Sequence, residues 1–236
     1  MLLLKRTLIC ACLLASFNGM AAGMVPDTSL LIVNEDKQGA SMDVKNTDAE
    51  AQLLYTKIID LPDDPKPGLF ATQPVVRVDA GKTQRVRFVL KSSAEPLKVE
   101  HFKRVIFTAI PQREKNKVKV VFSQNLPVII HPAGLAVNIE PWKALTWQIK
   151  NGNVTVENNT PYVVRLEQKV KLMASGTIAT LAKTYILPGE KMMASAPAKI
   201  SASEKQIEIY PATRYGYKAG NYIADLQQSN HLTNME

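Results

Sequence analysis

Apolar and polar residues alternate in short runs along most of this chain. In the first half, Gly, Pro, Asn and Asp separate the runs. Alternation at every second position is typical of strands that bury one face, and no segment there keeps the period of about 3.6 residues that a long helix needs. The pattern predicts an antiparallel β-sandwich. Its strands are expected over residues 29–33, 40–46, 52–59, 75–78, 84–91, 103–110 and 117–130.

A second set of strand patterns follows a turn that Pro132, Ala133 and Gly134 predict. A proline that fixes φ and a glycine that accepts unusual φ values redirect a chain easily, so we place a domain boundary there. We expect an N-terminal domain over residues 23–133 and a C-terminal domain over residues 134–236, each long enough to bury a core. Strands of the second domain are expected over residues 145–150, 153–158, 162–172, 184–187, 205–210 and 222–226.

The N-terminus has the features of an export signal. Lys5 and Arg6 precede the apolar run 7–17, and small residues follow that run. This order of basic, apolar and small residues predicts a cleaved signal peptide over residues 1–22, so we expect the mature protein to leave the cytoplasm. The apolar run is shorter than the roughly 20 residues that cross a bilayer as a helix.

Cysteines and charge restrict the mature chain further. Cys10 and Cys12 are the two cysteines, and both lie inside the predicted signal, so no disulfide is expected after cleavage. A lipoprotein modified at Cys12 is the alternative. Loss of Lys5 and Arg6 lowers the formal net charge from +8 to +6. The basic residues are scattered and no nucleic-acid motif accompanies them, so the excess favours solubility or acidic partners over nucleic-acid binding.

Five fragments, taken in order and spacing, resemble one known family. Three lie in the first half: 72–78 with 80–88, then Glu100 followed by Ile110 and Pro111, and then the alternating residues Val118, Val120 and Phe122; the other two are 156–164 and 187–190. Together they resemble the periplasmic pilus (fimbrial) chaperones of the chaperone–usher pathway. The short connection after Pro111 and the lack of cysteines in the mature chain resemble the short-loop branch of that family.

This resemblance implies a fold, a function and a binding strand. Members of the family consist of two immunoglobulin-like β-sandwich domains set at an angle. They bind pilus subunits, which lack a final strand, by donor-strand complementation, prevent their aggregation and deliver them to an outer-membrane usher. Val118, Val120 and Phe122 match the positions that fill the groove of the subunit. The resemblance also implies a periplasmic location, no catalysis and no cofactor.

One departure from the family concerns the anchor of the subunit. Members usually grip its C-terminal carboxylate with an arginine of the first strand and a lysine of the last strand of the first domain. The matching positions here are Leu30 or Leu31 and Pro127, which supply no cation. Charge-assisted contacts are among the stronger hydrogen bonds, so the change is substantial. Either another basic residue is the anchor, with Arg104 and Lys119 nearby in sequence, or this chain binds differently.

A second departure concerns the polar network between the domains. The family uses a glutamate, an arginine and an aspartate, and the corresponding positions here are Glu100, His131 and Arg214. We hypothesise that Glu100 pairs with Arg214, while His131 bridges them or packs beside them. The alternative is three unconnected residues.

Other interpretations stay open. The alternative for Val118, Val120 and Phe122 is an ordinary strand with one face on its own core. The alternative for the whole chain is a non-chaperone immunoglobulin-like protein of the periplasm or surface, adhesive or structural, and a hydrolase is a further one. His101, His131 and His231 have no metal-ligand spacing, and no nucleophile motif lies beside them. Because exposed donor strands invite self-association, we also expect a self-capping dimer of the free protein.

Overall fold

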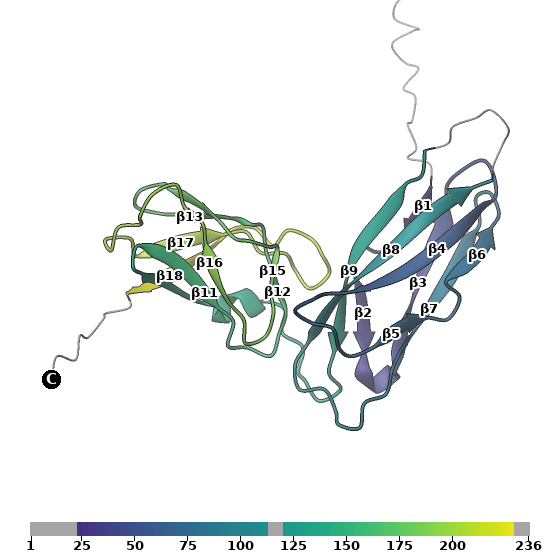
Figure 1. Ribbon diagram of the computed structural model, residues 1–236, viewed down its shortest axis with the longest axis horizontal. Helices are drawn as coiled ribbons and strands as arrows, with labels where there is room; N and C mark the ends of the chain where they lie inside the picture. The colour runs from purple at the N-terminus through teal and green to yellow at the C-terminus, as the bar shows by residue number, and fades with distance from the viewer. Residues whose placement is uncertain (1–22, 113–119, 229–236) are drawn as a thin grey trace, which may run out of the picture.

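The computed structural model describes residues 23–112 and 120–228, and it folds them into two β-sandwich domains (Figure 1). The first domain, purple to teal, lies beside the second, green to yellow, with the two long axes inclined to each other. The expected all-β fold of two domains set at an angle is confirmed. The predicted signal peptide lies outside the described residues. Within the described ranges, no helix is long and apolar enough to cross a membrane.

Nine strands and one short 3-10 turn build the first domain. They are β1 (Met24–Pro26), β2 (Leu31–Asn34), η1 (Glu35–Lys37), β3 (Gly39–Asn46), β4 (Gln52–Asp60), β5 (Leu69–Ala71), β6 (Val75–Val78), β7 (Thr83–Leu90), β8 (His101–Pro111) and β9 (Ser123–His131). Their hydrogen-bonded order is β5-β7-β3-β2-β9-β8-β4-β6, and β1 pairs with β3. β2 joins the two layers of the sandwich, because it bonds β3 on one side and runs parallel to β9 on the other.

The core of the first domain follows from the alternation. Leu126, Val128 and Ile130 of β9 point into the sandwich. Phe107 of β8 and Phe88 of β7, two strands that do not pair with each other, meet edge to face in this core, with ring centroids 6.4 Å apart. Full burial of one such side chain contributes about 1.5–3 kcal/mol. The buried side chains of this core therefore stabilise the domain.

The second domain has nine strands and the 3-10 turn η2 (Pro141–Ala144). The strands are β10 (Thr146–Lys150), β11 (Asn153–Glu157), β12 (Val164–Arg165), β13 (Lys169–Leu172), β14 (Ile178–Thr180), β15 (Tyr185–Ile186), β16 (Lys191–Ala194), β17 (Gln206–Ile209) and β18 (Tyr222–Gln228). Seven of them form a sheet in the order β14-β13-β17-β18-β10-β11-β16, and β12 pairs with β15. Trp142 and Trp147 are buried in its core.

The prediction of a strand over residues 117–130 is wrong for residues 120–122, the first part of this range that the structure describes. β9 begins at Ser123, and Val120–Phe122 lie outside any strand. The amide of Ala109 donates to the carbonyl of Phe122 at 3.2 Å, but no further ladder bond to 120–122 is present among the described residues. Exposed apolar side chains gain nothing from the protein's own core, so burial does not hold this segment in a strand.

The strand predicted over residues 162–172 is interrupted. β12 and β13 flank a short link in which the amide of Leu166 bonds the carbonyl of Thr184 and the amide of Glu167 bonds the carbonyl of Tyr210. The chain thus moves from one sheet to the other at this link. The short strands β1, β5, β14 and β16 were not predicted; β1, β5 and β14 have three residues each, too few to establish a period.

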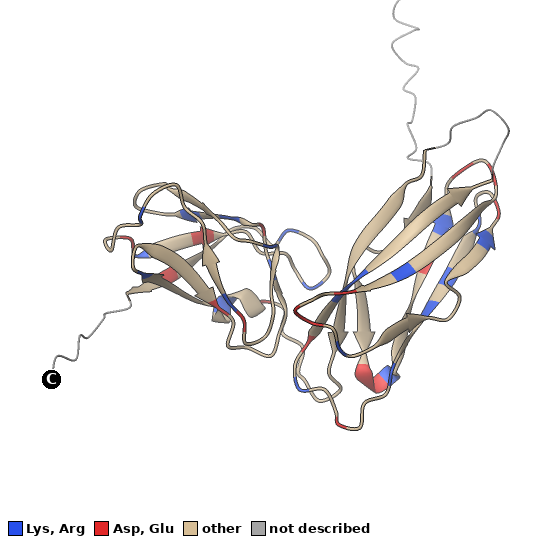
Figure 2. Ribbon diagram, viewed as in Figure 1, with Lys and Arg blue, Asp and Glu red and all other residues tan. Residues whose placement is uncertain are grey.

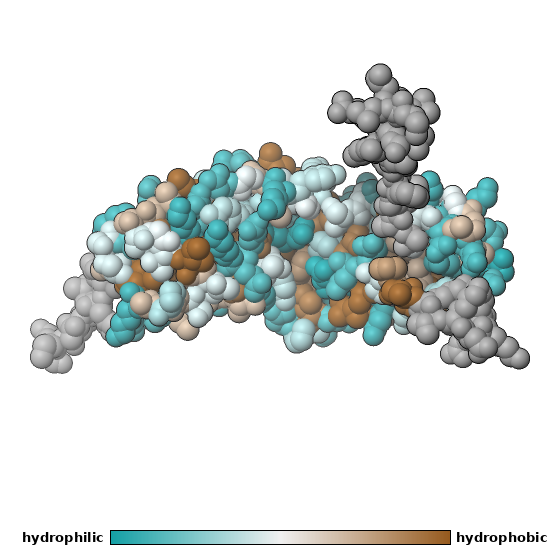
Figure 3. Space-filling model, turned by 90° about the horizontal axis from the view of Figure 1, so that it is seen from above, coloured by the Kyte–Doolittle hydropathy of each residue, from teal (hydrophilic) through white to brown (hydrophobic). Residues whose placement is uncertain are grey.

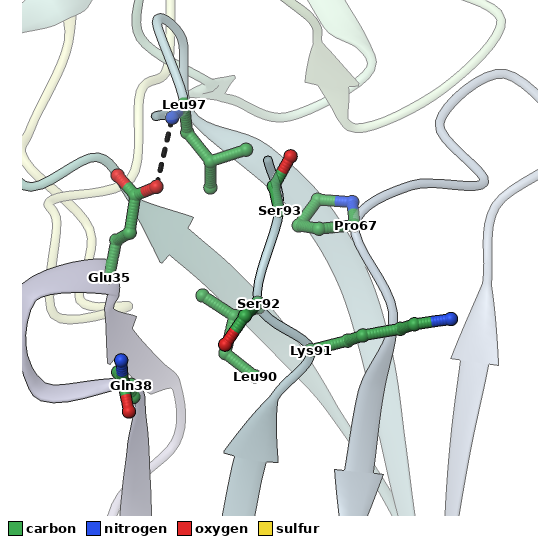
Figure 4. Close-up of a pocket in the computed structure, with 8 residues that line it drawn as sticks. All are labelled: Glu35, Gln38, Pro67, Leu90, Lys91, Ser92, Ser93 and Leu97. Atoms are coloured by element: carbon green, nitrogen blue, oxygen red, sulfur yellow. Dashed lines mark hydrogen bonds between the residues drawn. The ribbon is translucent and has the colours of Figure 1, made fainter. Parts of the chain in front are cut away.

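Glu35 ties the turn after β9 to the first sandwich. Its carboxylate accepts hydrogen bonds from the amides of Leu97 and Ala133, each at 2.9 Å. Figure 4 shows Glu35 directed at Leu97 beside a small pocket that Pro67 and Leu90 also line. One carboxylate therefore fixes the loop before β8 and the turn between the domains relative to each other.

The two domains share an apolar cluster. Phe102 and Ile129 of the first domain pack with Val163 and Leu187 of the second. The ring of Phe102 also lies against that of Tyr185 on β15, with centroids 4.7 Å apart. Packing as well as polar contacts thus joins the two sandwiches.

Candidate functional site

The segment from Val120 to His131 has two differently buried ends. Leu126, Val128 and Ile130 belong to the core, and Phe122 and Val120 continue the same spacing of every second residue in the sequence, before the first residue of β9. Phe122 is 59% exposed and Val120 is 71% exposed. The spacing of apolar side chains therefore continues in the sequence beyond the end of the protein's own core.

The backbone edge of β9 is open along the same part of the segment. β2 pairs with β9 only from Val128 onward, in register with Leu31. The carbonyl of Phe122 points toward β8. Because backbone N–H and C=O groups of successive residues point to opposite sides of a strand, those of Ser123, Asn125 and Pro127 point away from β8. No described strand pairs with Ser123 or Asn125 on that side, whereas the parallel register of Leu31 with Val128 places the carbonyl of Pro127 against β2. The edge before Pro127 can therefore accept another strand.

Apolar side chains reach the surface on both domains. Figure 3 shows them in brown among hydrophilic residues. The exposed large apolar residues near the open edge are Val120, Val121 and Phe122. Val118, the third predicted groove-filling residue, lies outside the described residues, as does Lys119.

Glu100 lies at the junction of the two domains and accepts three hydrogen bonds. Its Oε1 accepts from Nη1 of Arg214 at 2.7 Å and from Nδ1 of His131 at 2.8 Å, and its Oε2 accepts from the amide of Val163 at 3.0 Å. The side chains of Glu100, His131 and Arg214 are all buried. A buried carboxylate is stable only with such partners. The structure therefore brings together the three residues predicted for the network, from both domains.

His131 makes a second contact through its other ring nitrogen. Nε2 lies 3.0 Å from the carbonyl oxygen of Leu135, and Nδ1 faces Glu100. Both partners are acceptors, so both nitrogens can donate only when the ring carries two protons. In that form His131 adds a second positive charge beside Glu100, next to Arg214.

A second polar contact between the domains was not predicted. Lys183 of the second domain pairs with Asp63 of the first and with Glu190, the latter at 2.8 Å. The hydroxyl of Tyr185 also reaches Asp63, at 3.5 Å. Burial by itself lowers the pKa of Lys183, but hydrogen bonds to Asp63 and Glu190 outweigh it and raise the pKa above its usual value. Charged residues in loops give no sequence signal that distinguishes such a contact from solvated side chains.

The positions that match the family's carboxylate anchor carry no basic side chain that could bind a carboxylate. Leu30 is buried in the cluster between the domains, and Leu31 is buried in the first core. Pro127 lies opposite Arg104 in the register of β9 and β8. Of the two basic residues named as possible replacements, Arg104 lies within the described residues, and its Nε donates to Oδ1 of Asn125 at 2.8 Å.

Charge and histidine geometry give no sign of a metal site. Nδ1 of His101 lies 2.7 Å from Oδ1 of Asp64, and His231 lies outside the described residues. Among the described residues, no group of three or more His, Cys, Asp or Glu side chains is placed to hold a metal ion. Figure 2 shows Lys and Arg distributed over both domains rather than gathered on one face.

Two sandwiches joined at a buried polar cluster, with an open apolar strand edge, define a class of binding protein. The model of the N-terminal domain of the PapD pili and flagellar-assembly chaperones matches residues 23–136. The model of the C-terminal domain of the PapD pili assembly chaperones matches residues 140–220. This chain belongs to the family of pilus-assembly chaperones.

Relatives and solved structures agree with this assignment. The chain is 43% identical over 215 residues to YhcA of Escherichia coli K12, described as an uncharacterized fimbrial chaperone, and the match covers 90% of this chain and 94% of YhcA. The E. coli chaperone DraB has the same fold, with a TM-score of 0.69 at 18% identity, over 86% of this chain and 98% of that one. A Salmonella enterica structure of the SafA pilin in complex with the SafB chaperone matches with a TM-score of 0.69 at 20% identity, over 88% and 98%.

Proposed function

We propose that this protein is a periplasmic chaperone that binds pilus subunits by donor-strand complementation. The open edge of the segment from Val120 to Pro127 supplies the backbone groups, and Val118, Val120 and Phe122 fill apolar pockets of the subunit. The chaperone thereby prevents aggregation of the subunit and delivers it to an outer-membrane usher. Glu100, His131 and Arg214 hold the two domains at the angle that the complex needs.

One observation carries this proposal. Val120 and Phe122 continue the apolar spacing of β9 in the sequence, yet they are exposed, next to an edge of β9 that no described strand pairs with before Pro127. Strand addition uses this combination, because main-chain hydrogen bonds give affinity and alternate side chains give specificity. Each of the apolar side chains contributes about 1.5–3 kcal/mol when a partner buries it fully.

The rival function is that of an immunoglobulin-like surface protein without chaperone activity. It uses the same fold but does not stabilise an isolated subunit. The family membership and the exposed apolar segment favour the chaperone. The two functions differ in one measurable property, the capture of an incomplete subunit.

Capture can be tested by co-expression in the periplasm with the pilus subunit encoded beside this chain. Affinity purification and native mass spectrometry should give a one-to-one complex for the wild type. Phe122→Asp should abolish it while the free protein keeps its melting temperature, because Phe122 is exposed. Val75→Asp is the matched control, since Val75 is also exposed but lies on β6, away from the edge. Equal capture by both variants, or none by the wild type, would contradict the proposal.

The exposed segment also motivates the proposed self-capping dimer. Two free molecules can cover Val120 and Phe122 by pairing their open edges. Sedimentation velocity over a hundredfold range of concentration should show a dimer for the wild type and a monomer for Phe122→Asp. A wild type that stays monomeric throughout removes this part of the proposal and leaves subunit capture untouched.

A further inference from the structure

His131 joins two parts of the chain that meet at the junction of the domains. Its ring is buried at the end of β9. Nδ1 lies 2.8 Å from Oε1 of Glu100, which also binds Arg214 of the second domain. Nε2 lies 3.0 Å from the carbonyl oxygen of Leu135, in the link between the two domains. The ring therefore ties that link to the buried carboxylate.

Neither partner of the ring is placed to donate a hydrogen bond to it. The carbonyl of Leu135 is an acceptor only. The carboxylate of Glu100 already accepts from Nη1 of Arg214 at 2.7 Å and from the amide of Val163 at 3.0 Å, so a proton on either oxygen would face another donor. Both contacts of His131 are therefore hydrogen bonds only when the imidazole carries two protons.

Loss of one proton affects the two contacts unequally. A neutral imidazole keeps one N–H, and its other nitrogen turns a lone pair toward its partner. A hydrogen bond to a carboxylate is about twice as strong as one between neutral groups, so the remaining proton stays on Nδ1, which faces Glu100. Nε2 then places a lone pair against the carbonyl oxygen of Leu135. The contact with the link between the domains is the one that breaks.

Charged groups of both signs surround the ring. Glu100 and Arg214 belong to the same buried cluster, and Arg165 of β12 lines the small cavity that these two also line. Glu35, directly after β2, bonds the turn that follows β9. The two carboxylates favour a second proton on the ring, whereas the two arginines oppose it. Because both signs are present, the ring can exchange this proton as the pH changes.

We propose that His131 makes the junction between the domains sensitive to pH. With two protons, the ring holds the link at Leu135 to the carboxylate cluster. After the loss of one proton the link is released, and the two domains move more freely relative to each other. Glu100 keeps its bonds to Arg214 and Val163, so the domains stay joined. This inference goes beyond the proposed function, because it concerns the free protein.

The direction of the effect follows from where the proton is bound. In an unfolded chain, histidine loses its charge near about pH 6.5, because no partner holds the second proton. The folded junction binds that proton through both ring contacts, so unfolding at higher pH releases it. The stability of the protein should therefore fall as the pH rises, since the folded state holds more protons than the unfolded state.

NMR can read the protonation of the ring directly. Long-range ¹⁵N–¹H spectra of the ¹⁵N-labelled mature protein distinguish an imidazole with two protons from either neutral tautomer. At about pH 6 both nitrogens of His131 should carry protons, and toward about pH 9 Nε2 should lose its proton while Nδ1 retains its own. A ring that is already neutral at the lower pH, or that loses the Nδ1 proton first, would overturn the proposal.

Residual dipolar couplings of the backbone amides test the consequence for the domains. Measured over the same pH range, they report how strictly the two domains keep one relative orientation. In the wild type this order should fall along the same curve as the charge on His131. His131→Gln has no group that titrates at this place, so its couplings should not follow that curve. Wild-type couplings that stay constant while His131 loses its proton would overturn the proposal.

His101 supplies the matched control. Its Nδ1 pairs with Oδ1 of Asp64 at 2.7 Å within the first domain, and no hydrogen bond to its Nε2 is present among the described residues. A neutral ring can therefore keep this contact. His101→Gln should retain the pH-dependent change in domain orientation, and His131→Gln should abolish it. Equal pH dependence of the orientation in the wild type and both variants would overturn the proposal.

Thermal unfolding gives an independent measure of the same proton. Between about pH 6 and about pH 9, the melting temperature of the wild type should fall by about 2–4 °C more than that of His131→Gln, the shift expected for the loss of one hydrogen bond in a protein of this size. A melting temperature that rises with pH in the wild type relative to this variant would reverse the sign and contradict the proposal.

Discussion

The two ends of the segment from Val120 to His131 share one pattern and have opposite surroundings. At the C-terminal end, Val128 and Ile130 are completely buried, and His131 enters the polar cluster between the domains. At the N-terminal end, Val120 and Phe122 are mostly exposed and β9 has an open edge. The C-terminal end therefore stabilises the protein's own fold, and the N-terminal end is available to a partner.

The difference teaches that alternation alone does not separate a core strand from a donor strand. Both have apolar residues at every second position, because both bury one face. What differs is which protein supplies the residues that cover the apolar face. The protein's own sandwich covers Leu126–Ile130, and in the proposed complex the subunit covers Val120 and Phe122.

The largest effect is expected from breaking the polar cluster at the buried end. Glu100→Ala leaves Arg214 and His131 without their buried acceptor, which should lower the free energy of unfolding by about 3–5 kcal/mol. Urea denaturation measures this loss. Small-angle scattering should also show a changed distribution of domain orientations, because Glu100 joins Arg214 and Val163 of the second domain.

Glu95→Ala is the control for that change. Glu95 is exposed, and the same charge is removed from the same domain, so stability should stay within about 0.5 kcal/mol. If Glu100→Ala left both the unfolding free energy and the scattering profile unchanged, the hypothesis of an interdomain network would be wrong.

A smaller effect is expected from the core of the same strand. Ile130→Ala removes a completely buried side chain and should cost about 2–5 kcal/mol, depending on how far the cavity collapses. Thermal and urea unfolding of the free protein measure it. Subunit capture by the fraction that remains folded should be retained, since Ile130 does not lie on the open edge. Loss of capture at unchanged stability would show that Ile130 belongs to the subunit-binding part of the segment, and not to the core.

Much of the fold was predictable from local pattern. The strands with clear alternation, such as 40–46 and 52–59, agree with β3 and β4 to within a residue at each end. β1 and β5 escaped prediction because three residues do not define a period. The strand expected at Val120 failed for another reason, since its apolar residues have no described layer of this chain to cover them.

The site was less accessible to sequence reasoning than the fold. Glu100, His131 and Arg214 were brought together by resemblance to a family, not by any spacing, since they are far apart along the chain. Lys183 gave no signal at all. Its role depends on the carboxylates that it meets, and that is decided by the packing of two domains.

The smallest effect on stability is expected at the exposed end. Val120→Ala removes a side chain that is 71% exposed, so the unfolding free energy should change by no more than about 0.5 kcal/mol. Affinity for the co-expressed subunit should nevertheless fall, because burial of the lost methyl groups in the complex contributes about 0.8 kcal/mol per carbon. Competition between wild type and variant for limiting subunit, followed by native mass spectrometry, measures that difference. A variant that loses stability but competes equally well would place Val120 in the protein's own core and end the distinction between the two halves of the strand.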